Sequence, residues 1–199
     1  MAKIYFRYGA MDSSKTANLL MVAYNYEKQG RKVLVFKPSV DNRFGVGKIV
    51  SRLGIERDCI DINDESDLME IVMKSQESEK IDCILLDECQ FINETQVLQL
   101  VDICDNLDIP IICYGLKNSY ISGRIFPGII ALLYYADSIE EVKNVCAFCD
   151  RKATMNLRVI NGKAVYSGNI VEIGDTKCDA EEHYYPACRK HYMTFNKMK

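Results

Sequence analysis

The sequence predicts an α/β fold with a doubly wound parallel sheet, followed by a smaller C-terminal domain of different character. Over residues 1–145, short apolar runs alternate with segments whose apolar residues recur at helical spacing. This alternation is typical of a parallel sheet with helices on both faces. After residue 145 the alternation stops, and four of the nine cysteines fall in the remaining segment. We therefore expect two domains, residues 1–145 and 146–199.

The elements expected in the first domain follow one another in a regular order. The run from Ile81 to Leu86 is apolar without strict alternation, as expected of a strand covered on both faces. Val97, Leu100 and Val101 recur at helical spacing. The expected strands are Ile4–Tyr8, Val33–Phe36, Ile81–Leu86, Ile109–Tyr114 and Ser138–Val145, and the expected helices span residues 15–29, 64–77 and 93–106.

The second domain begins with a hairpin pattern. Two short apolar runs within residues 157–166 flank Asn161-Gly162, a pair that favours a type I′ turn. The next segment, residues 167–183, is polar and contains glycine, so we expect a long loop there.

Composition excludes several classes of protein. A hydrophobic content of 48% and a charged content of 27% are those of an ordinary globular protein. The net charge of −3 argues against nucleic-acid partners. The chain has no apolar stretch long enough to span a membrane and no signal-peptide pattern, so cytoplasmic residence is expected. Most of the first five cysteines lie in apolar runs, as buried thiols do in a reducing compartment.

The first motif is a phosphate-binding loop between the first strand and the first helix. Its backbone N–H groups would surround phosphates at the positive end of the helix. Lys15 would neutralise phosphate charge, and the Thr16 hydroxyl would bind Mg²⁺. This motif makes the predicted fold P-loop NTPase-like. The phosphate-binding residues are Gly9, Ala10, Met11, Asp12, Ser13, Ser14, Lys15 and Thr16.

Ser14 departs from the motif, which has glycine at this position. That glycine commonly adopts a backbone conformation that disfavours residues with a Cβ, at a cost of about 1–3 kcal/mol. The loop therefore either tolerates Ser14 at some cost in phosphate affinity or binds a triphosphate poorly.

Two carboxylates follow the apolar strand that ends at Leu86. The carboxyl end of a parallel strand faces the ligand crevice, so Asp87 would hold Mg²⁺ opposite the phosphate loop. Glu88 would then act as a base on an attacking hydroxyl. The alternative is that both residues cap the next helix. Together with the phosphate loop, the pair favours a phosphotransferase or NTPase.

Arg43 lies just after the second strand and so at the same end of the sheet. An arginine there would stabilise the charge that develops on a transferred phosphoryl group. A solvated turn between Asp41 and Gly45 explains the spacing equally well.

Two pairs of metal-binding residues frame the hairpin. Cys146 and Cys149 form one C-x-x-C pair, and Cys188 and His191 form a C-x-x-H pair, with 38 residues between the two pairs. Such pairs complete a tetrahedral Cys₃His site, so a structural Zn²⁺ with no open position is expected. Unrelated free thiols are the alternative, and the nearby Cys178 and His183 are possible substitute ligands. A zinc-dependent nucleic-acid binder is disfavoured by the acidic balance.

Taken in order, these motifs resemble the thymidine kinase family found in many bacteria and in animal cytosol. The resemblance covers nearly the whole chain. Besides the phosphate loop, it rests on Val40–Lys48 (VDNRFGVGK), Asp87–Phe91 (DECQF), Cys113–Leu116 (CYGL) and Cys188–Tyr192 (CRKHY).

The resemblance implies transfer of the γ-phosphate of ATP to the 5′-hydroxyl of thymidine, in pyrimidine deoxynucleoside salvage for DNA synthesis. It implies Glu88 as the general base, Asp87 and Thr16 as Mg²⁺ contacts and Arg43 as an active-site arginine. It also implies a homotetramer and a lasso loop that holds the thymine edge. The implied nucleoside-binding residues are Met11, Phe91, Leu116, Tyr120, Phe126, Val171, Glu172, Ile173, Gly174 and Tyr184.

The chain departs from the family pattern in the pocket as well as at Ser14. Asn118-Ser119-Tyr120 lacks the family's aspartate and has Tyr in place of Phe, and the lasso is longer and more acidic. An unpaired buried hydroxyl at Tyr120 would cost roughly 1–3 kcal/mol. Two alternatives to thymidine kinase activity therefore remain: a diverged nucleotide-binding paralogue with weak or no kinase activity, and a kinase with another deoxynucleoside preference.

Overall fold

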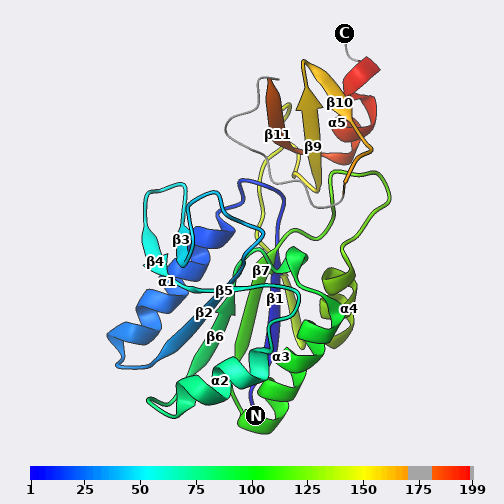
Figure 1. Ribbon diagram of the computed structural model, residues 1–199. Coiled ribbons are helices and arrows are strands. Elements are labelled where there is room, and N and C mark those ends of the chain that lie inside the picture. Colours follow the sequence, from blue (N-terminus) through cyan, green and yellow to red (C-terminus); the bar gives the residue numbers. More distant parts are fainter. Residues whose placement is uncertain (170–180, 198–199) are drawn as a thin grey trace.

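The computed structural model describes residues 1–169 and 181–197. Its centre is a six-stranded sheet in the order β5-β2-β6-β7-β1-β8, and all paired strands run parallel. Figure 1 shows the twisted sheet with its strands upright and their carboxyl ends at the top. The strands are β1 (Ile4–Tyr8), β2 (Val33–Pro38), β5 (Ile60–Ile62), β6 (Cys83–Leu86), β7 (Ile111–Gly115) and β8 (Ser138–Glu141).

Helices cover both faces of this sheet, which confirms the predicted doubly wound α/β fold (Figure 1). On one face α1 (Lys15–Lys28) packs Leu19, Leu20 and Ala23 against residues of β2, β6 and β7. On the other face lie α2 (Leu68–Gln76), α3 (Glu94–Leu107) and α4 (Pro127–Tyr135), which share one large apolar core with the sheet.

The start of α3 shows whether Asp87 and Glu88 cap the next helix, which was the alternative interpretation of these two residues. Asn93 caps this helix: its side chain accepts a hydrogen bond from the Gln96 N–H, and the Gln96 side chain accepts one from the Asn93 N–H. This reciprocal arrangement is a capping box. Asp87 and Glu88 therefore do not cap α3. They precede a short 3₁₀ helix, η1 (Cys89–Phe91), to which the Glu88 side chain makes no capping hydrogen bond.

The C-terminal segment forms its own small sheet. Strand β9 (Met155–Ile160) pairs antiparallel with β10 (Lys163–Val165) and with β11 (Glu182–Ala187). Asn161 (φ 49°) and Gly162 (φ 71°) form the predicted hairpin turn with positive φ angles. Helix α5 (Arg189–Thr194) and the 3₁₀ helix η2 (Phe195–Lys197) complete a separate apolar core. Figure 1 shows this sheet beyond the carboxyl ends of the parallel strands.

Several elements differ from those expected. Strands β3 (Lys48–Val50), β4 (Glu56–Asp58) and β5 were not predicted, because three residues are too few to show a periodicity. Helix α4 was also missed, because its run of apolar residues has no polar face to show the helical period. The expected strand Ser138–Val145 ends at Glu141, and the helix expected from residue 64 begins after its cap at Asp67.

The predicted loop at residues 167–183 was wrong at its end, because β11 begins at Glu182. Within residues 1–169 and 181–197, no helix combines the length and the apolar character needed to cross a membrane.

Candidate active site

A cavity of about 670 Å³ lies between the carboxyl ends of the parallel strands and the C-terminal sheet. Six parts of the chain form its walls: the phosphate loop, residues 41–53, the β6–η1 junction, residues 116–126, strand β9 and strand β11. It brings most of the sequence-predicted site residues together. Those along its walls are Met11, Asp12, Ser13, Ser14, Lys15, Thr16, Arg43, Glu88, Phe91, Leu116, Tyr120, Phe126 and Tyr184.

The phosphate loop joins β1 to α1, and Lys15 is folded back onto it. The Lys15 Nζ donates hydrogen bonds to the carbonyls of Gly9 (3.3 Å) and Ala10 (2.9 Å) and to the Ser13 hydroxyl (3.3 Å). Burial lowers the pKa of Lys15, although the charges of Glu88 and Asp87 act in the opposite direction. Gly9 is needed for space, because a Cβ there would lie 2.5 Å from the carbonyl oxygen of Val142.

Ser14 has the backbone conformation that the motif normally reserves for glycine. Its φ is 62° and its ψ 25°, in the left-handed region. Asp12 in the same loop also has a φ of 62°. Left-handed geometry costs an L-residue roughly 1–2 kcal/mol relative to glycine. The loop has thus kept its shape with Ser14 in place, at an energetic cost to the fold.

Thr16 lines the cavity and is in direct contact with Asp87, which is buried behind it. The Thr16 hydroxyl donates a hydrogen bond of 2.9 Å to Asp87 Oδ2. Burial and the charge of Glu88 raise the pKa of Asp87 well above the usual range of a carboxyl. A divalent cation would offset both effects, because it favours the ionised carboxylate. One hydroxyl and one buried carboxylate at this place are oxygen ligands of the type that Mg²⁺ uses.

Glu88 is fixed by an ion pair with Arg43. Arg43 Nη2 lies 2.6 Å from Glu88 Oε1, and the same guanidinium holds Asp41 through Nε (2.6 Å) and Nη2 (2.9 Å). Burial acts to lower the pKa of Arg43, but the two carboxylates outweigh it and raise the pKa. Burial acts to raise the pKa of Asp41, but the hydrogen bonds from Arg43 leave it lowered. Arg43 does lie in an exposed turn, as the alternative expected, but its guanidinium is held there by the two carboxylates.

Two further residues of this network were not singled out from the sequence. Gln90 donates a hydrogen bond of 2.5 Å to Glu88 Oε2 and accepts one of 2.9 Å from the Leu116 N–H. Lys37 is buried, and its Nζ donates to the carbonyls of Asp41 (2.8 Å) and Gly45 (3.0 Å). The sequence offered a signal for Gln90, which lies within one of the motifs quoted above. It offered none for Lys37, which differs from other lysines only in being buried.

Aromatic side chains form the wall opposite the phosphate loop. Phe91 and Phe126 meet edge to face with ring centroids 5.8 Å apart, and Tyr120 and Tyr184 do so at 6.1 Å. Phe126 also belongs to the main apolar core. The four rings and Leu116 line the cavity with largely apolar side chains, which can accommodate a base.

The hydroxyl of Tyr120 is fully paired. It donates to the Asn169 carbonyl (2.9 Å) and accepts a hydrogen bond from Arg158 Nη1 (3.0 Å). The Arg158 guanidinium lies 5.0 Å from the Tyr120 ring centroid, and its Nε also pairs with Glu182 at 2.7 Å. The penalty expected for an unpaired hydroxyl therefore does not arise.

Four predicted nucleoside-binding residues and one alternative zinc ligand cannot be placed. Val171, Glu172, Ile173, Gly174 and Cys178 lie outside the described residues.

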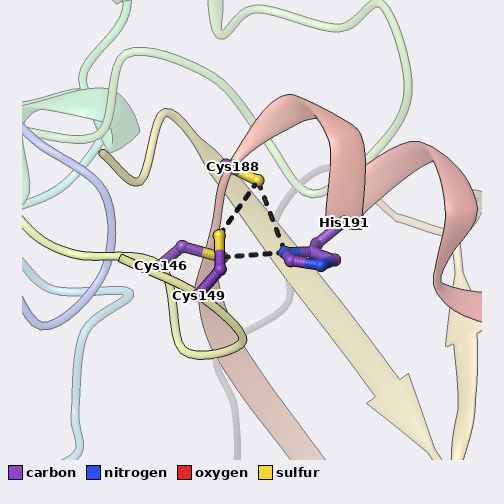
Figure 2. A group of neighbouring side chains, drawn as sticks. All are labelled: Cys146, Cys149, Cys188 and His191. Carbon is purple, nitrogen blue, oxygen red and sulfur yellow. Dashed lines mark hydrogen bonds between the residues drawn. The ribbon is translucent and has the colours of Figure 1, made fainter. Parts of the chain in front are cut away.

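The Cys/His cluster joins the two ends of the C-terminal segment (Figure 2). The ligand atoms of Cys146, Cys149, Cys188 and His191 all lie within 4.8 Å of one another. His191 Nδ1 is 3.4 Å from the sulfurs of Cys146 and Cys188, and the sulfurs of Cys149 and Cys188 are 3.9 Å apart. Around a tetrahedral zinc ion, the nitrogen–sulfur separation would be about 3.5 Å and the sulfur–sulfur separation about 3.8 Å. The four residues therefore fit Zn²⁺.

His183, the other alternative zinc ligand, lies at the cavity and not in the Cys/His cluster. Its Nε2 lies 3.7 Å from Glu181 Oε1, and the residue lines the cavity. The pKa of the Cys188 thiol is lowered. Burial acts to raise it, but hydrogen bonds led by the His191 backbone N–H outweigh that effect. A lower pKa favours the thiolate, which is the form that binds a metal.

The fold and the cavity define a P-loop α/β protein that carries a Cys₃His cluster. The chain belongs to the thymidine kinase family, whose model matches residues 2–192. It is 46% identical to a thymidine kinase of Lactobacillus acidophilus over 199 residues, covering 97% of each chain. It is also 46% identical to a thymidine kinase of Enterococcus faecalis (97% of this chain, 95% of the relative) and to one of Francisella tularensis subsp. holarctica (96% and 97%).

Proposed function

We propose that this protein transfers the γ-phosphate of ATP to the 5′-hydroxyl of thymidine, giving dTMP and ADP. The observation that carries the proposal is the contact between Thr16 and Asp87, with Glu88 beside it in the same cavity. This contact joins the start of α1 to the end of β6, which is where a P-loop kinase holds the metal that bridges two phosphates. Membership of the thymidine kinase family supports the choice of acceptor.

The phosphate side is assigned to the loop between β1 and α1. The N–H groups of residues 9–16 would receive the phosphate oxygens at the N-terminus of α1. Lys15 would exchange its hydrogen bonds to loop carbonyls for bonds to the β- and γ-phosphates. Thr16 and Asp87 would hold Mg²⁺, which when bound neutralises phosphate charge as the transfer proceeds.

Glu88 is assigned the role of general base. Its two oxygens accept hydrogen bonds from Arg43 and Gln90, which fix the carboxylate while each oxygen keeps a further lone pair. The proton of the 5′-hydroxyl passes to this carboxylate as the O5′–Pγ bond forms. The bond between Pγ and the bridging oxygen breaks, and ADP leaves with the electron pair. Arg43 would stabilise charge on the transferred group.

The nucleoside side is assigned to the aromatic wall. Phe91, Tyr120, Phe126 and Tyr184 with Leu116 and Met11 would enclose the base. The lasso residues Val171, Glu172, Ile173 and Gly174 would hold its polar edge, as the family resemblance implies. Cys146, Cys149, Cys188 and His191 would bind a structural Zn²⁺ that fixes the ends of this segment.

The family resemblance supports a proposal for the assembly, and the lack of a signal-peptide pattern supports one for the location. We propose a homotetramer in the cytoplasm, with ATP and thymidine as small-molecule substrates.

A kinase for another deoxynucleoside is a second candidate, favoured by the charged part of the wall. Glu182 and His183 line the cavity next to the Tyr120–Arg158 pair. Polar groups at a base-binding wall can select between exocyclic amino and carbonyl groups.

A panel of acceptors tests the proposal. ADP release from ATP–Mg²⁺ would be followed with thymidine, deoxyuridine, deoxycytidine and deoxyguanosine as acceptors. Turnover confined to thymidine and deoxyuridine is expected. Turnover on deoxycytidine or deoxyguanosine alone would favour the second candidate, and no turnover with folded, zinc-loaded protein would reject both.

A further inference from the structure

Asn156 connects the two sides of the cavity, although nothing in the sequence singles it out. It lies on β9 and is only 1% exposed. Its Oδ1 accepts a hydrogen bond of 2.8 Å from the backbone N–H of Met11, and its Nδ2 donates one of 2.9 Å to the carbonyl of Asn118. One side-chain amide thus holds two loops that are more than a hundred residues apart in sequence.

The two loops that Asn156 holds carry different parts of the proposed reaction. Met11 belongs to the phosphate loop, and its carbonyl is also held, by Asn144 Nδ2 at 3.0 Å. Asn118 lies in the segment after β7, between Leu116 and Tyr120, which both belong to the aromatic wall. Asn156 therefore spans from the phosphate side to the nucleoside side.

The strand that carries Asn156 is itself fixed by the Cys/His cluster. Asn156 pairs with Pro186 in the β9–β11 ladder, two residues before Cys188. Cys146 and Cys149 hold the other end of the segment, just before β9. Asn156 is thus placed by a paired strand of the C-terminal sheet and not by either of the loops that it contacts.

We propose that Asn156 is a positioning residue, which fixes the phosphate loop relative to the nucleoside wall so that the 5′-hydroxyl meets the γ-phosphate in line. This inference rests on the proposed function. Phosphoryl transfer depends largely on positioning and charge stabilisation, and a misplacement of about 1 Å costs about 10²-fold in rate. Loss of the Asn156 amide should therefore lower kcat more than it weakens the binding of either substrate alone.

Asn196 provides a matched control. It lies on η2 and makes the same pair of hydrogen bonds, to the N–H (2.7 Å) and the carbonyl (3.0 Å) of Ala164 on β10. These bonds stay inside the C-terminal unit, and Asn196 does not line the cavity. Asn196→Ala removes as many hydrogen bonds as Asn156→Ala without touching either loop.

The experiment compares full-length, zinc-loaded Asn156→Ala and Asn196→Ala with the wild-type chain. We would measure kcat with thymidine, the separate Kd values of a non-hydrolysable ATP analogue and of thymidine, and backbone hydrogen exchange. Asn156→Ala should lower kcat by about 10- to 100-fold. Each Kd should change by less than about threefold, and exchange should speed up in residues 9–16 and 117–126. Asn196→Ala should leave kcat and both loops unchanged.

Asn156→Asp keeps the side-chain shape and guards against a general loss of folding. Its carboxylate still accepts from Met11 but cannot donate to Asn118. Exchange should then speed up at residues 117–126 while residues 9–16 stay as protected as in the wild type. Equal kcat in the two alanine variants, or unchanged exchange in both loops of Asn156→Ala, would overturn the inference. If the wild-type chain makes no dTMP, the proposed function fails, and the exchange pattern still decides whether Asn156 holds the loops.

Discussion

The phosphate side and the nucleoside side of the cavity are built in different ways. The phosphate side is almost entirely local: eight consecutive residues, from the end of β1 into the first turn of α1, supply the loop, and two adjacent carboxylates follow β6. The nucleoside side draws on η1, the segment after β7, β9 and β11, and the last two belong to a sheet fixed by the Cys/His cluster. The phosphate side therefore depends on backbone conformation, and the nucleoside side on tertiary packing.

Loss of the Cys/His cluster should impair the nucleoside side far more than the phosphate side, and this is the largest difference that we expect between them. Cys188→Ala removes one of four zinc ligands, and structural zinc supplies much of the folding energy of small metal-held units. We expect zinc content near zero, loss of turnover and a rise of more than about 10²-fold in the Kd for thymidine. The Kd for ATP–Mg²⁺ should rise by less than about tenfold.

Cys59→Ala is the control for this change, because Cys59 is half-buried and lies outside the cluster. It should keep one zinc per chain, measured by atomic emission. Full activity of Cys188→Ala without zinc would contradict a structural role for the cluster.

Glu88→Gln tests the chemistry at the point where the two sides meet. The amide cannot accept a proton from the 5′-hydroxyl, so kcat should fall by about 10²- to 10⁴-fold. The Kd values measured by calorimetry should stay within about threefold. Glu94→Gln, in the exposed first turn of α3, should leave kcat unchanged. A wild-type kcat in Glu88→Gln would remove Glu88 from the proposed role.

Tyr120→Phe probes a part of the nucleoside wall that departs from the family pattern. It removes the hydrogen bonds to Arg158 and to the Asn169 carbonyl. The free energy of unfolding should fall by about 1–2 kcal/mol, measured by denaturant titration. The Kd for thymidine should change by less than about threefold, because the hydroxyl is occupied by protein groups. A large gain in thymidine affinity would show that the hydroxyl faces the base after all.

Ser14→Gly should have the smallest effect, and on the phosphate side alone. Because Ser14 already has a φ of 62°, the cost of that geometry falls on folding and not on nucleotide binding. We expect the free energy of unfolding to rise by at most about 1 kcal/mol, since glycine also gains entropy in the unfolded chain. The Kd for ATP should change by less than about twofold. Clearly tighter ATP binding would show that Ser14 impairs phosphate binding itself.

The contrast between the two sides also explains what the sequence could predict. Five strands of the parallel sheet, three of its helices, the phosphate loop and the Cys/His pairs were predicted because each depends on neighbouring residues or on fixed spacing. The sequence showed that Ser14 stands at the glycine position of the motif, but its left-handed conformation is known only from the structure. The zinc-type cluster followed from two C-x-x-(C/H) pairs, and the structure brings all four residues together.

What could not be predicted depends on contacts between distant parts of the chain. Asn156 has no motif around it, and only the fold places it between Met11 and Asn118. Lys37 is an ordinary lysine in the sequence, yet its burial next to the 41–45 turn helps to hold the segment that carries Arg43. The pairing of Tyr120 with Arg158 likewise requires β9 to lie beside the segment after β7.

The most direct test of the account is a ³¹P NMR spectrum of the products formed from ATP–Mg²⁺ and thymidine. We expect equal amounts of ADP and a nucleoside monophosphate, with the new phosphorus coupled to the two C5′ protons. Inorganic phosphate in place of the monophosphate, or a phosphorus coupled to the single C3′ proton, would contradict it.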